Sequence, residues 1–519
     1  MRNQSYVEQL IRQRAFEQPD QTWLHFKDQA FQWREVISNS QRVANGLLEL
    51  GLRPGDRIGL MAGNRPEFLW AYFGSLMIGC EVVPINKWQR GAALEHMLKD
   101  SSIAALAYDL DLDGVVAEIR PKIPLLRWTI LLSGPRMGSA DASLSEFLAS
   151  APDRDPAVDV VTAPGAVGIL YTSGTTGPPK GILSKHYEPC LRPLIEALKI
   201  RPGEVMYTCM PLFHASALLV FGIGSIRQNA QLAVGASFSA SGFWDDIRRY
   251  NAVSANVFGV MIPFLLKQPI RDDDRNNPMR CVLSVGCPKA AWRDFEQRFD
   301  LKVVEFYGAS DAPGFLINQD GRPGSVGKPA AGAEFRVVDD NDNDVPIGKR
   351  GEIIYRHLGE HSSTYNNLPD VTAQVYRGGW YHSGDIGEID EEGFFYFHGR
   401  MKEAIRRRGE NISAWEISSV IDVHPKVLES AAFGVPSEEG EEEVMVSVVP
   451  QPGATITPEE LLDYCQGRIA YYAMPRYVDI VSELPKTGTQ KIQHLVLKAR
   501  GRTANTWDRE QAKYLVQRV

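Results

Sequence analysis

The chain has 519 residues and a formal net charge of −8, with 44% hydrophobic and 23% charged residues. This composition is ordinary for a globular protein, and the length exceeds what one hydrophobic core usually serves, so we expect two or more domains. The acidic balance argues against binding of nucleic acids or of broad anionic membranes. It does not exclude a nucleotide, which needs only a local cationic pocket.

Cysteine usage and the composition of the chain ends predict the compartment. The six cysteines are scattered and none forms a C-x-x-C pair, which favours buried thiols in a reducing environment. The first 20 residues are charged throughout, unlike a signal peptide, and the last residues carry no peroxisomal tripeptide. No apolar run approaches the ~20 residues of a membrane span. We predict a cytoplasmic protein without a membrane span, and the sequence leaves a homodimer open.

Short apolar runs alternate with helical patterns over most of the chain. Several runs are apolar on both faces, which is typical of parallel strands covered by helices. The predicted strands are 57–61, 81–85, 104–108, 129–132, 166–172, 231–234, 253–258, 282–285 and 303–307. This alternation predicts an α/β fold with a large N-terminal domain of helix-covered sheets.

The pattern changes after about residue 320. Turn-rich pieces such as 339–348 separate short strands, including 351–355, which predicts a small antiparallel, barrel-like unit. The acidic runs 272–274 and 438–443 are interpreted as solvated loops.

A second change comes near residues 399–402. Beyond it, the capping boxes at Ser413 and Thr457 predict two helices, and the runs 431–435 and 444–449 predict two strands. We therefore divide the chain into an N-terminal domain, 1–400, and a small α+β C-terminal domain, 401–519.

The strongest motif is YTSGTTGPPKG at residues 171–181, directly after an apolar run. Its glycines let the backbone approach an anion, its hydroxyls donate hydrogen bonds, and its lysine adds a positive charge. It predicts a phosphate-binding loop, and one that differs from the G-x-x-x-x-G-K-[ST] loop of kinases. The phosphate-binding residues predicted here are Thr172, Ser173, Gly174, Thr175, Thr176, Gly177 and Lys180.

This loop resembles the signature segment of the adenylate-forming superfamily, which includes acyl-CoA synthetases, luciferases and the adenylation domains of peptide synthetases. Five further segments match the family in order along the chain. They are YGASD at 307–311, YHSGD at 381–385, GRMKE at 399–403, GENIS at 409–413 and PKTGTQK at 485–491. The resemblance implies that the protein uses ATP and Mg²⁺ to convert a carboxylic acid into an acyl-AMP, with release of pyrophosphate.

The resemblance also implies a nucleotide site. Asp385 would hold the ribose hydroxyls, since a carboxylate offers two acceptor oxygens, and Arg400 would be the second ribose contact. Tyr307 would stack on the adenine, and Ser310 would face the α-phosphate. The other walls of the adenine pocket would be Gly286, Cys287, Pro288, Glu305, Phe306 and Gly308.

Two positions depart from the family pattern. Asp311 stands where a Mg²⁺-binding glutamate is usual, and with Thr175 it is the predicted metal site. Because its carboxylate is one methylene shorter, contact through a water is expected. Gln490 replaces the glycine that usually precedes the C-terminal lysine.

Two lysines take their expected roles from the resemblance. Lys491 would bridge the substrate carboxylate and the α-phosphate, where charge builds up in the transition state. Lys402 matches the hinge about which the mobile C-terminal domain swings between adenylation and thiol transfer.

The segment PLFH at 211–214 resembles acyl- and aryl-CoA synthetases, in which His214 would border the carboxylate site and the thiol tunnel. No aspartate lies between Met210 and Ile223, which disfavours an α-amino acid substrate. The resemblance implies coenzyme A or a carrier thiol as the acceptor, with Arg408, Gly409 and Glu410 on its side. Small and apolar residues predict a roomy pocket for a medium or bulky acid. These residues are His214, Phe258, Gly259, Val260, Gly286, Ala309, Ala312, Pro313 and Gly314.

Three alternatives stay open. A partner protein would perform the thiol step if this chain only adenylates. The segment GASDA at 308–312 nearly fits the G-x-S-x-G motif of serine hydrolases. A non-catalytic nucleotide-binding protein would explain the departures at Asp311 and Gln490.

Overall fold

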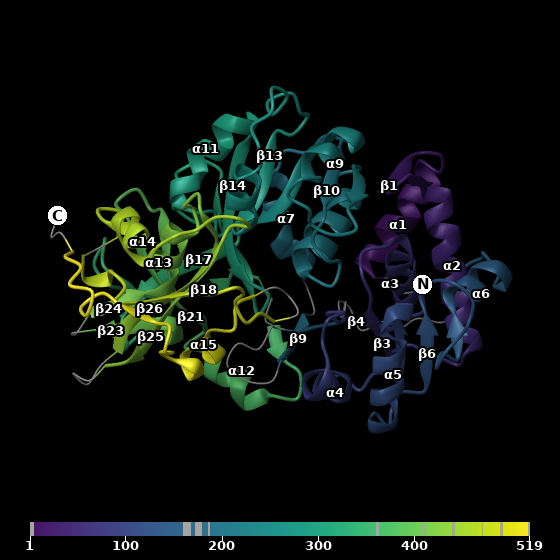
Figure 1. The fold of residues 1–519 in the computed structure, drawn as a ribbon. Coiled ribbons are helices and arrows are strands. Elements are labelled where there is room, and N and C mark those ends of the chain that lie inside the picture. Colours follow the sequence, from purple (N-terminus) through teal and green to yellow (C-terminus); the bar gives the residue numbers. More distant parts are fainter. Residues whose placement is uncertain are drawn as a thin grey trace.

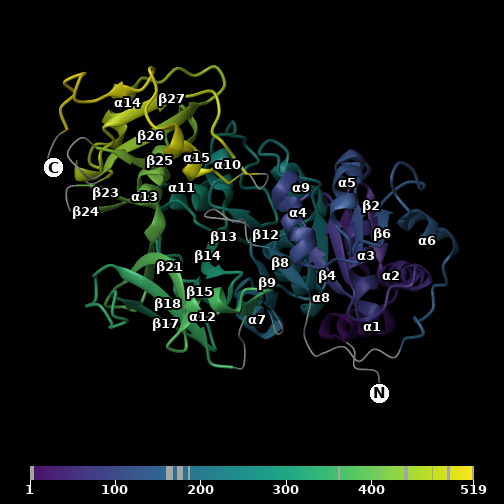
Figure 2. The same cartoon turned by 90° about the horizontal axis from the view of Figure 1, so that it is seen from below.

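The computed structural model describes residues 5–158, 168–171, 179–184, 187–359, 363–407, 410–437, 442–469, 471–487 and 491–516. Figures 1 and 2 place residues from about 404 onward beside the middle of the chain and away from the N-terminal helices. Among the described residues, none of the helices combines the length and the apolar character needed to cross a membrane.

The first sheet has five parallel strands in the order β4-β3-β5-β6-β7. The predicted strands in this region are confirmed, with ends that differ by no more than one residue. Their bounds are β3 (Arg57–Met61), β4 (Glu81–Pro84), β5 (Ala105–Tyr108), β6 (Trp128–Leu131) and β7 (Ala142–Ser143). The helices of this region are α2 (Trp33–Glu49), α3 (Pro66–Met77), α4 (Gly91–Asp100), η1 (Leu110–Leu112), α5 (Asp113–Ile119), η2 (Arg120–Lys122) and α6 (Leu144–Ser150).

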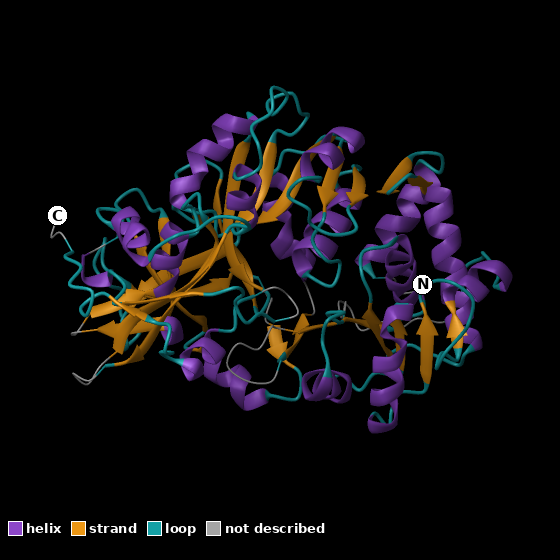
Figure 3. Ribbon diagram, in the orientation of Figure 1, coloured by secondary structure: helices purple, strands orange, loops and turns teal. Residues whose placement is uncertain are grey.

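The second sheet has nine strands in the order β16-β15-β14-β13-β12-β10-β11-β1-β2. Its middle strands are parallel and its outer strands antiparallel. Figure 3 shows helices on both faces, which explains why strands such as β12 are buried along almost their whole length. The strands are β1 (Thr22–Phe26), β2 (Gln29–Gln32), β10 (Val205–Thr208), β11 (Gln231–Val234), β12 (Ala252–Phe258), β13 (Cys281–Val285), β14 (Lys302–Ala309), β15 (Ala312–Asn318) and β16 (Lys328–Pro329).

The helices that accompany the second sheet include one π-helix, η3, which follows the PLFH segment. Their bounds are α1 (Tyr6–Glu17), α7 (Tyr187–Ala197), η3 (Ser216–Ile223), α8 (Gly224–Arg227), α9 (Phe243–Tyr250), α10 (Met261–Leu266) and α11 (Lys289–Phe299). The mixed α/β fold predicted for this part is confirmed.

A third, antiparallel sheet of five strands follows, as predicted for the region after residue 320. Its path is β17-β18-β21-β20, and β22 also pairs with β21. The elements are β17 (Ala333–Val338), β18 (Gly351–His357), α12 (Pro369–Val375), β20 (Tyr376–Arg377), β21 (Trp380–Ile389) and β22 (Phe395–Arg400). A small sheet of β8 (Ile169–Tyr171), β9 (Gly181–Ser184) and β19 (Ser363–Tyr365) flanks the phosphate-loop segment.

The C-terminal unit, residues 404–516, has its own hydrophobic clusters, built around α13, β25 and β26. Its main sheet has the order β25-β26-β27-β28. The elements, after η4 (Met401–Glu403), are β23 (Ala404–Arg407), β24 (Glu410–Ser413), α13 (Ala414–Ile421), β25 (Val427–Pro436), β26 (Glu442–Pro450), α14 (Pro458–Cys465), η5 (Tyr471–Ala473), β27 (Tyr477–Ile480), α15 (His494–Arg500) and β28 (Trp507–Asp508).

Both predicted helix starts in this unit are confirmed. Ser413 accepts a hydrogen bond from the backbone of Glu416, and Thr457 accepts one from Glu460. The two glutamate side chains, however, are engaged in other contacts. Glu416 Oε1 lies 2.7 Å from His398 Nδ1, and Glu460 Oε1 lies 2.7 Å from the ammonium of Lys426.

Candidate active site

The described parts of the predicted nucleotide site meet where β14 reaches β21 and β22. Asp385 on β21 is paired in register with Arg400 on β22, and its Oδ1 lies 3.3 Å from Arg400 Nε. The Tyr307 hydroxyl, from β14, donates a 2.6 Å hydrogen bond to the other carboxylate oxygen. Asp385 is thus held by residues of two different sheets, with only 6% of its surface exposed.

Tyr307 is buried among aromatic side chains of the third sheet. Its ring lies 5.9–6.4 Å from the rings of Phe397, Tyr355 and Phe335. Burial, together with the nearby Asp385 charge, raises the pKa of Tyr307 well above its usual value, so the hydroxyl stays a donor. The sequence indicated an aromatic wall here but not this bond, and the stacking of adenine on Tyr307 stays a prediction.

The turn at Gly286, Cys287 and Pro288 is shaped by the buried Glu305. The Glu305 carboxylate accepts hydrogen bonds from the backbone N–H groups of Gly286 and Cys287. Burial raises the pKa of Glu305 to about 7, against the effect of those hydrogen bonds. Pro288 then caps helix α11. Glu305 therefore fixes the backbone of the predicted adenine wall.

Gly259 is packed against the same turn. A Cβ atom added at Gly259 would lie 1.7 Å from the carbonyl oxygen of Gly286, and Gly286 itself has φ +79°. A side chain at Gly259 would therefore force the backbone to move, whereas one at Gly286 would have space but would be strained by the left-handed backbone conformation. The two glycines bring β12 and the turn into direct backbone contact.

Alternation along β14 separates the predicted adenine residues into two faces. Glu305 and Tyr307 point to one face, whereas the Phe306 ring lies on the other, 6.0 Å from the Phe315 ring in the main core. The Cys287 side chain is also in that core. The side chains of Phe306 and Cys287 are therefore committed to packing, so these two positions would contribute to an adenine wall through their backbone, and their place in that wall stays a prediction.

Asp311, the predicted metal ligand, lies at the turn between β14 and β15. The Tyr365 hydroxyl donates a hydrogen bond to its carboxylate, and the Tyr376 hydroxyl donates one of 2.9 Å to its backbone oxygen. Burial raises the pKa of Asp311, and the Tyr365 bond and the charges of Arg400, Lys180 and Lys491 act in the opposite direction. Three predicted site cations from distant segments thus influence the charge of one carboxylate.

The position of Ser310 in the fold excludes the serine hydrolase alternative. A hydrolase nucleophile sits on a sharp turn between a strand and a helix. Ser310 instead lies in the hairpin between the antiparallel strands β14 and β15, where Ala309 pairs with Ala312.

The C-terminal lysine reaches the same site from the other unit. On the two sides of residues 488–490, the Thr487 N–H donates to the Lys491 carbonyl at 2.7 Å. The charge of Lys491 acts on Asp311 and also on His214. Residues more than 270 positions apart in the sequence therefore form one constellation.

His214, just before η3, lies against two aromatic rings. The rings of Phe213 and Phe258 lie 4.6 and 6.1 Å from its imidazole. Burial, and next the charge of Lys491, lowers the pKa of His214 to about 4. The imidazole is therefore neutral at physiological pH.

The remaining predicted residues of the acid pocket lie near this histidine or at the β14–β15 turn. Val260 is 51% exposed, Ala312 is buried, and Gly314 has φ +130°. Ala309 donates its N–H to the Tyr355 hydroxyl at 3.2 Å, while Gly308 lies within β14. Lys402, the predicted hinge, is exposed in η4, directly after β22.

Some predicted residues lie outside the described part of the chain. These are Thr172, Ser173, Gly174, Thr175, Thr176 and Gly177 of the phosphate loop, Gln490, and Arg408 and Gly409 on the thiol side. For Glu410 and Pro313 the backbone is described but the side chain is not. Lys180, at the end of the loop, lies 5.2 Å from the centre of the Tyr365 ring.

Comparison with known families decides the identity. The model of the family described as "AMP-binding enzyme" matches residues 11–360. The model of the "AMP-binding enzyme C-terminal domain" matches residues 416–491. The chain belongs to the AMP-binding enzyme family. The predicted membership in the adenylate-forming superfamily, in its acyl-CoA synthetase branch, is thereby confirmed, and with it an AMP-forming ligase as the class of enzyme.

Proteins similar to this chain include CoA ligases. The crotonobetaine/carnitine–CoA ligase of Salmonella typhimurium is 29% identical over 477 residues, which cover 89% of this chain and 92% of that protein. ATP-bound MatB from Rhodopseudomonas palustris superposes with a TM-score of 0.83 at 26% identity, covering 95% and 98% of the two chains. The anthranilate CoA ligase AuaEII, in complex with anthranoyl-AMP, has a TM-score of 0.86 at 23% identity, with coverage of 96% and 97%.

The bond between Tyr307 and Asp385 gives a first prediction. Tyr307→Phe removes a hydrogen bond to a buried carboxylate, so we expect the KM for ATP in pyrophosphate exchange to rise about 5- to 20-fold. Tyr396→Phe is the matched control, because its hydroxyl donates to Asp390 in the same sheet, at 3.0 Å. An unchanged KM in Tyr307→Phe would show that the bond does not orient Asp385.

The buried Glu305 gives a second prediction, for stability against pH. Its pKa is raised from 4.5 to about 7 on folding, so its protonated form stabilises the fold. This contribution is complete below about pH 4.5 and is lost as the pH rises through about 7. The unfolding free energy of the unmodified protein should fall between pH 5 and 9. That of Glu305→Gln should fall by about 1–3 kcal/mol less. Denaturant unfolding across this range measures it, and parallel pH curves for the two proteins would contradict it.

Proposed function

We propose that this enzyme activates a medium-sized or bulky carboxylic acid and transfers it to coenzyme A, with the site residues in the roles given below. In the first half-reaction a carboxylate oxygen bonds to the α-phosphorus of ATP, and the bond to the leaving pyrophosphate breaks. In the second, a thiol attacks the acyl carbon and AMP leaves.

The observation that carries the proposal is the position of Lys491. Its charge acts on His214, at the predicted acid pocket, and on Asp311, at the predicted phosphate side. A cation that reaches both can neutralise the charge that develops between a carboxylate and an α-phosphate. In the proposed mechanism, the C-terminal unit would supply this cation during adenylation.

The ribose and the phosphates would be held by separate groups. Asp385, oriented by Tyr307 and Arg400, would accept the ribose hydroxyls. Lys180 and the loop before it would hold the phosphates. Glu305 would keep the adenine turn in place through its backbone hydrogen bonds.

The surroundings of Asp311 fit a magnesium nucleotide. Three cations act on this carboxylate, and such a cationic setting suits a polyphosphate. The carboxylate supplies an oxygen of the kind that Mg²⁺ prefers. When bound, Mg²⁺ would neutralise part of the phosphate charge, and Asp311 would meet it directly or through a water. An o-succinylbenzoate CoA synthetase from Bacillus subtilis, solved with ATP and a magnesium ion, has a similar fold, with a TM-score of 0.81.

The choice of acid would follow from the neutral, enclosed His214 and its apolar neighbours. A neutral imidazole between two phenyl rings favours an apolar acyl group over one that carries a second charge. Coenzyme A as the acceptor is supported by the similarity to the crotonobetaine/carnitine–CoA ligase. The boundary between domains 1–400 and 401–519 would lie just before Lys402, which is exposed between β22 and β23. The C-terminal domain would rotate about this residue.

Pyrophosphate exchange with a panel of carboxylic acids, followed by a coenzyme A assay on each acid that exchanges, tests the proposal. We expect exchange with aliphatic or aromatic acids and formation of their CoA thioesters. Exchange without a thioester would favour a partner protein for the second step. Tight ATP binding with no exchange for any acid would favour the non-catalytic alternative.

The role of Lys491 gives a third prediction. Lys491→Ala should lower acyl-AMP formation by about 100-fold or more, judging by the loss of comparable electrostatic groups. Thiol transfer from supplied acyl-AMP should be largely retained, because the lysine is needed only while charge develops on the α-phosphate. Rapid-quench measurement of each half-reaction tests this, and an equal loss in both would contradict the separation of roles.

The role of Asp311 gives a fourth prediction. Asp311→Asn keeps the size but removes the charge, so it should weaken the dependence of pyrophosphate exchange on magnesium and slow adenylation, with little effect on folding. Asp311→Glu is the matched variant and should retain substantial activity. Magnesium titrations of exchange compare the three proteins, and an identical curve for Asp311→Asn would mean that the residue only forms the turn.

A further inference from the structure

Helix α13 of the C-terminal unit contacts the rest of the protein at both of its ends. At its start, Glu416 Oε1 lies 2.9 Å from a guanidinium nitrogen of Arg350 and 2.7 Å from His398 Nδ1. Burial alone would raise the pKa of Glu416, but the bond from His398 and the charge of Arg350 outweigh it and lower the value. This contact lies next to the predicted hinge, so it restrains rotation only weakly.

The other end of α13 is held by Lys267, which follows α10 and lies far from the hinge in the sequence. Its ammonium donates 2.7 and 2.5 Å hydrogen bonds to the backbone oxygens of Asp422 and Val427. Asp422 is the C-cap of α13, and a cation there also complements the negative end of the helix dipole. Three N–H donors on one ammonium can serve both carbonyls at once.

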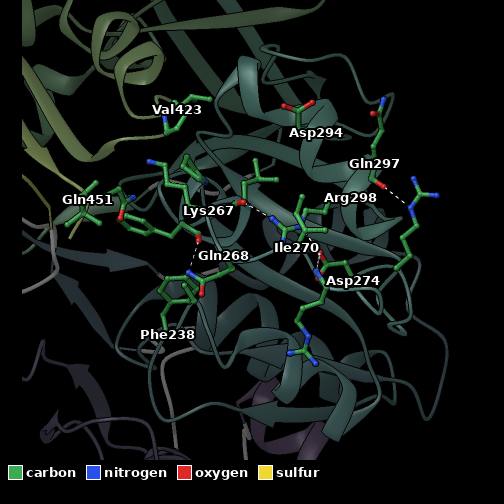
Figure 4. A pocket seen from close by; sticks show the side chains of 18 of the residues that line it. Phe238, Lys267, Gln268, Ile270, Asp274, Asp294, Gln297, Arg298, Val423 and Gln451 are labelled. Atoms are coloured by element: carbon green, nitrogen blue, oxygen red, sulfur yellow. Dashed lines mark hydrogen bonds and ion pairs between the residues drawn. The ribbon is translucent and has the colours of Figure 1, made fainter. Parts of the chain in front are cut away.

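The backbone on both sides of Lys267 is itself held by neighbouring contacts. Arg298 donates to the backbone oxygens of Leu266 and Pro269, at 2.6 and 2.8 Å, and pairs with the buried Asp274. Beside it lies a cavity of about 1120 Å³, lined by residues of both units (Figure 4). Figure 4 draws Lys267, Val423 and Gln451 along one side of this cavity. The hydrogen bonds of Lys267 therefore cross the interface between the two units at the edge of this cavity.

A short chain of contacts links Lys267 to the catalytic lysine. Val427 is the first residue of β25, and Glu429, two residues further on, holds the ammonium of Lys486 at 2.6 Å. Lys486 and Ile492 form an isolated β-bridge, which closes the turn that carries Lys491. A restraint on the start of β25 is thereby transmitted to the position of Lys491.

We propose that Lys267 is a positioning residue for adenylation, which holds the start of β25 against α10 and so keeps Lys491 over the site. The inference rests on the proposed function, in which Lys491 acts only in the first half-reaction. Movement of the C-terminal unit for thiol transfer must break both hydrogen bonds of Lys267. Loss of this residue therefore affects the two half-reactions unequally.

The test compares Lys267→Met, which keeps the aliphatic stem but loses the donors, with Lys267→Arg, which keeps the charge. Lys302→Met is the matched control, because Lys302 is exposed at the start of β14. We expect Lys267→Met to slow single-turnover acyl-AMP formation about tenfold and to leave transfer from supplied acyl-AMP within about twofold. Lys267→Arg should recover most of the rate, and the control should match the unmodified enzyme.

A second readout needs no turnover. Lys122→Cys and Glu459→Cys place labels on exposed positions of the two units, while the five described cysteines are buried. Lys267→Met should add a second population to the distance distribution between the labels, and Lys267→Arg should not. Glu429→Gln, which breaks the link to Lys486, should slow adenylation without altering that distribution.

The outcomes are distinguishable. Equal loss of both half-reactions in Lys267→Met, or an unchanged adenylation rate with an unchanged distance distribution, overturns the inference. Should Lys267→Met not fold, Lys267→Gln and Glu429→Gln carry the same comparison. Absence of acyl-AMP formation in the unmodified enzyme would instead overturn the proposed function, and the label distances would still test the contact.

Discussion

The hydrogen bond from Tyr307 to Asp385 is the interaction on which the arrangement of this site depends. It joins the end of a strand in the nine-stranded sheet to a strand of the antiparallel sheet, and the carboxylate is almost fully buried. A buried carboxylate is costly unless it is well bonded, and here Arg400 approaches its other oxygen. The two sheets can therefore present their site residues together only in one relative position.

The second constraint is that the site is assembled from two units with separate cores. Each unit buries its own apolar residues, and polar contacts join the two: Glu416 with Arg350 and His398, and Lys267 with two backbone oxygens. The Phe397 and Trp415 rings also meet across the boundary, 5.4 Å apart. Polar contacts of this kind exchange with water at low cost. Contacts that exchange in this way suit an enzyme with two successive half-reactions.

The sequence predicted the framework well because the framework follows from local patterns. Parallel strands covered by helices leave continuous apolar runs, and the starts of α13 and α14 follow from a serine or threonine three residues before a glutamate. The collinear motifs also identified Asp385, Arg400, Asp311 and Lys491, which the structure brings to one region. The phosphate loop itself, from Thr172 to Gly177, lies outside the described residues.

What the sequence could not predict depends on contacts between distant segments. Glu416 fits a capping box, yet its carboxylate goes to His398 and Arg350. Asp274 belongs to an acidic run interpreted as solvated, but it is buried and paired with Arg298. Phe306 lies within a site motif, and only the alternation of β14 and the packing of Phe315 show that its ring belongs to the core. No pattern along the chain records such partners.

The backbone contact between Gly259 and Gly286 limits how this enzyme can change its acid during evolution. One wall beside the nucleotide turn is made of two main chains already at closest approach, so no substitution there can shrink or enlarge the space gradually. In the proposed acid pocket, drift towards larger or smaller acids would proceed through the opposite walls, at His214, Val260 or the β14–β15 turn. Selectivity for the acid and the geometry of the proposed adenine turn would then be encoded at different positions, so that the first could vary while the second is kept.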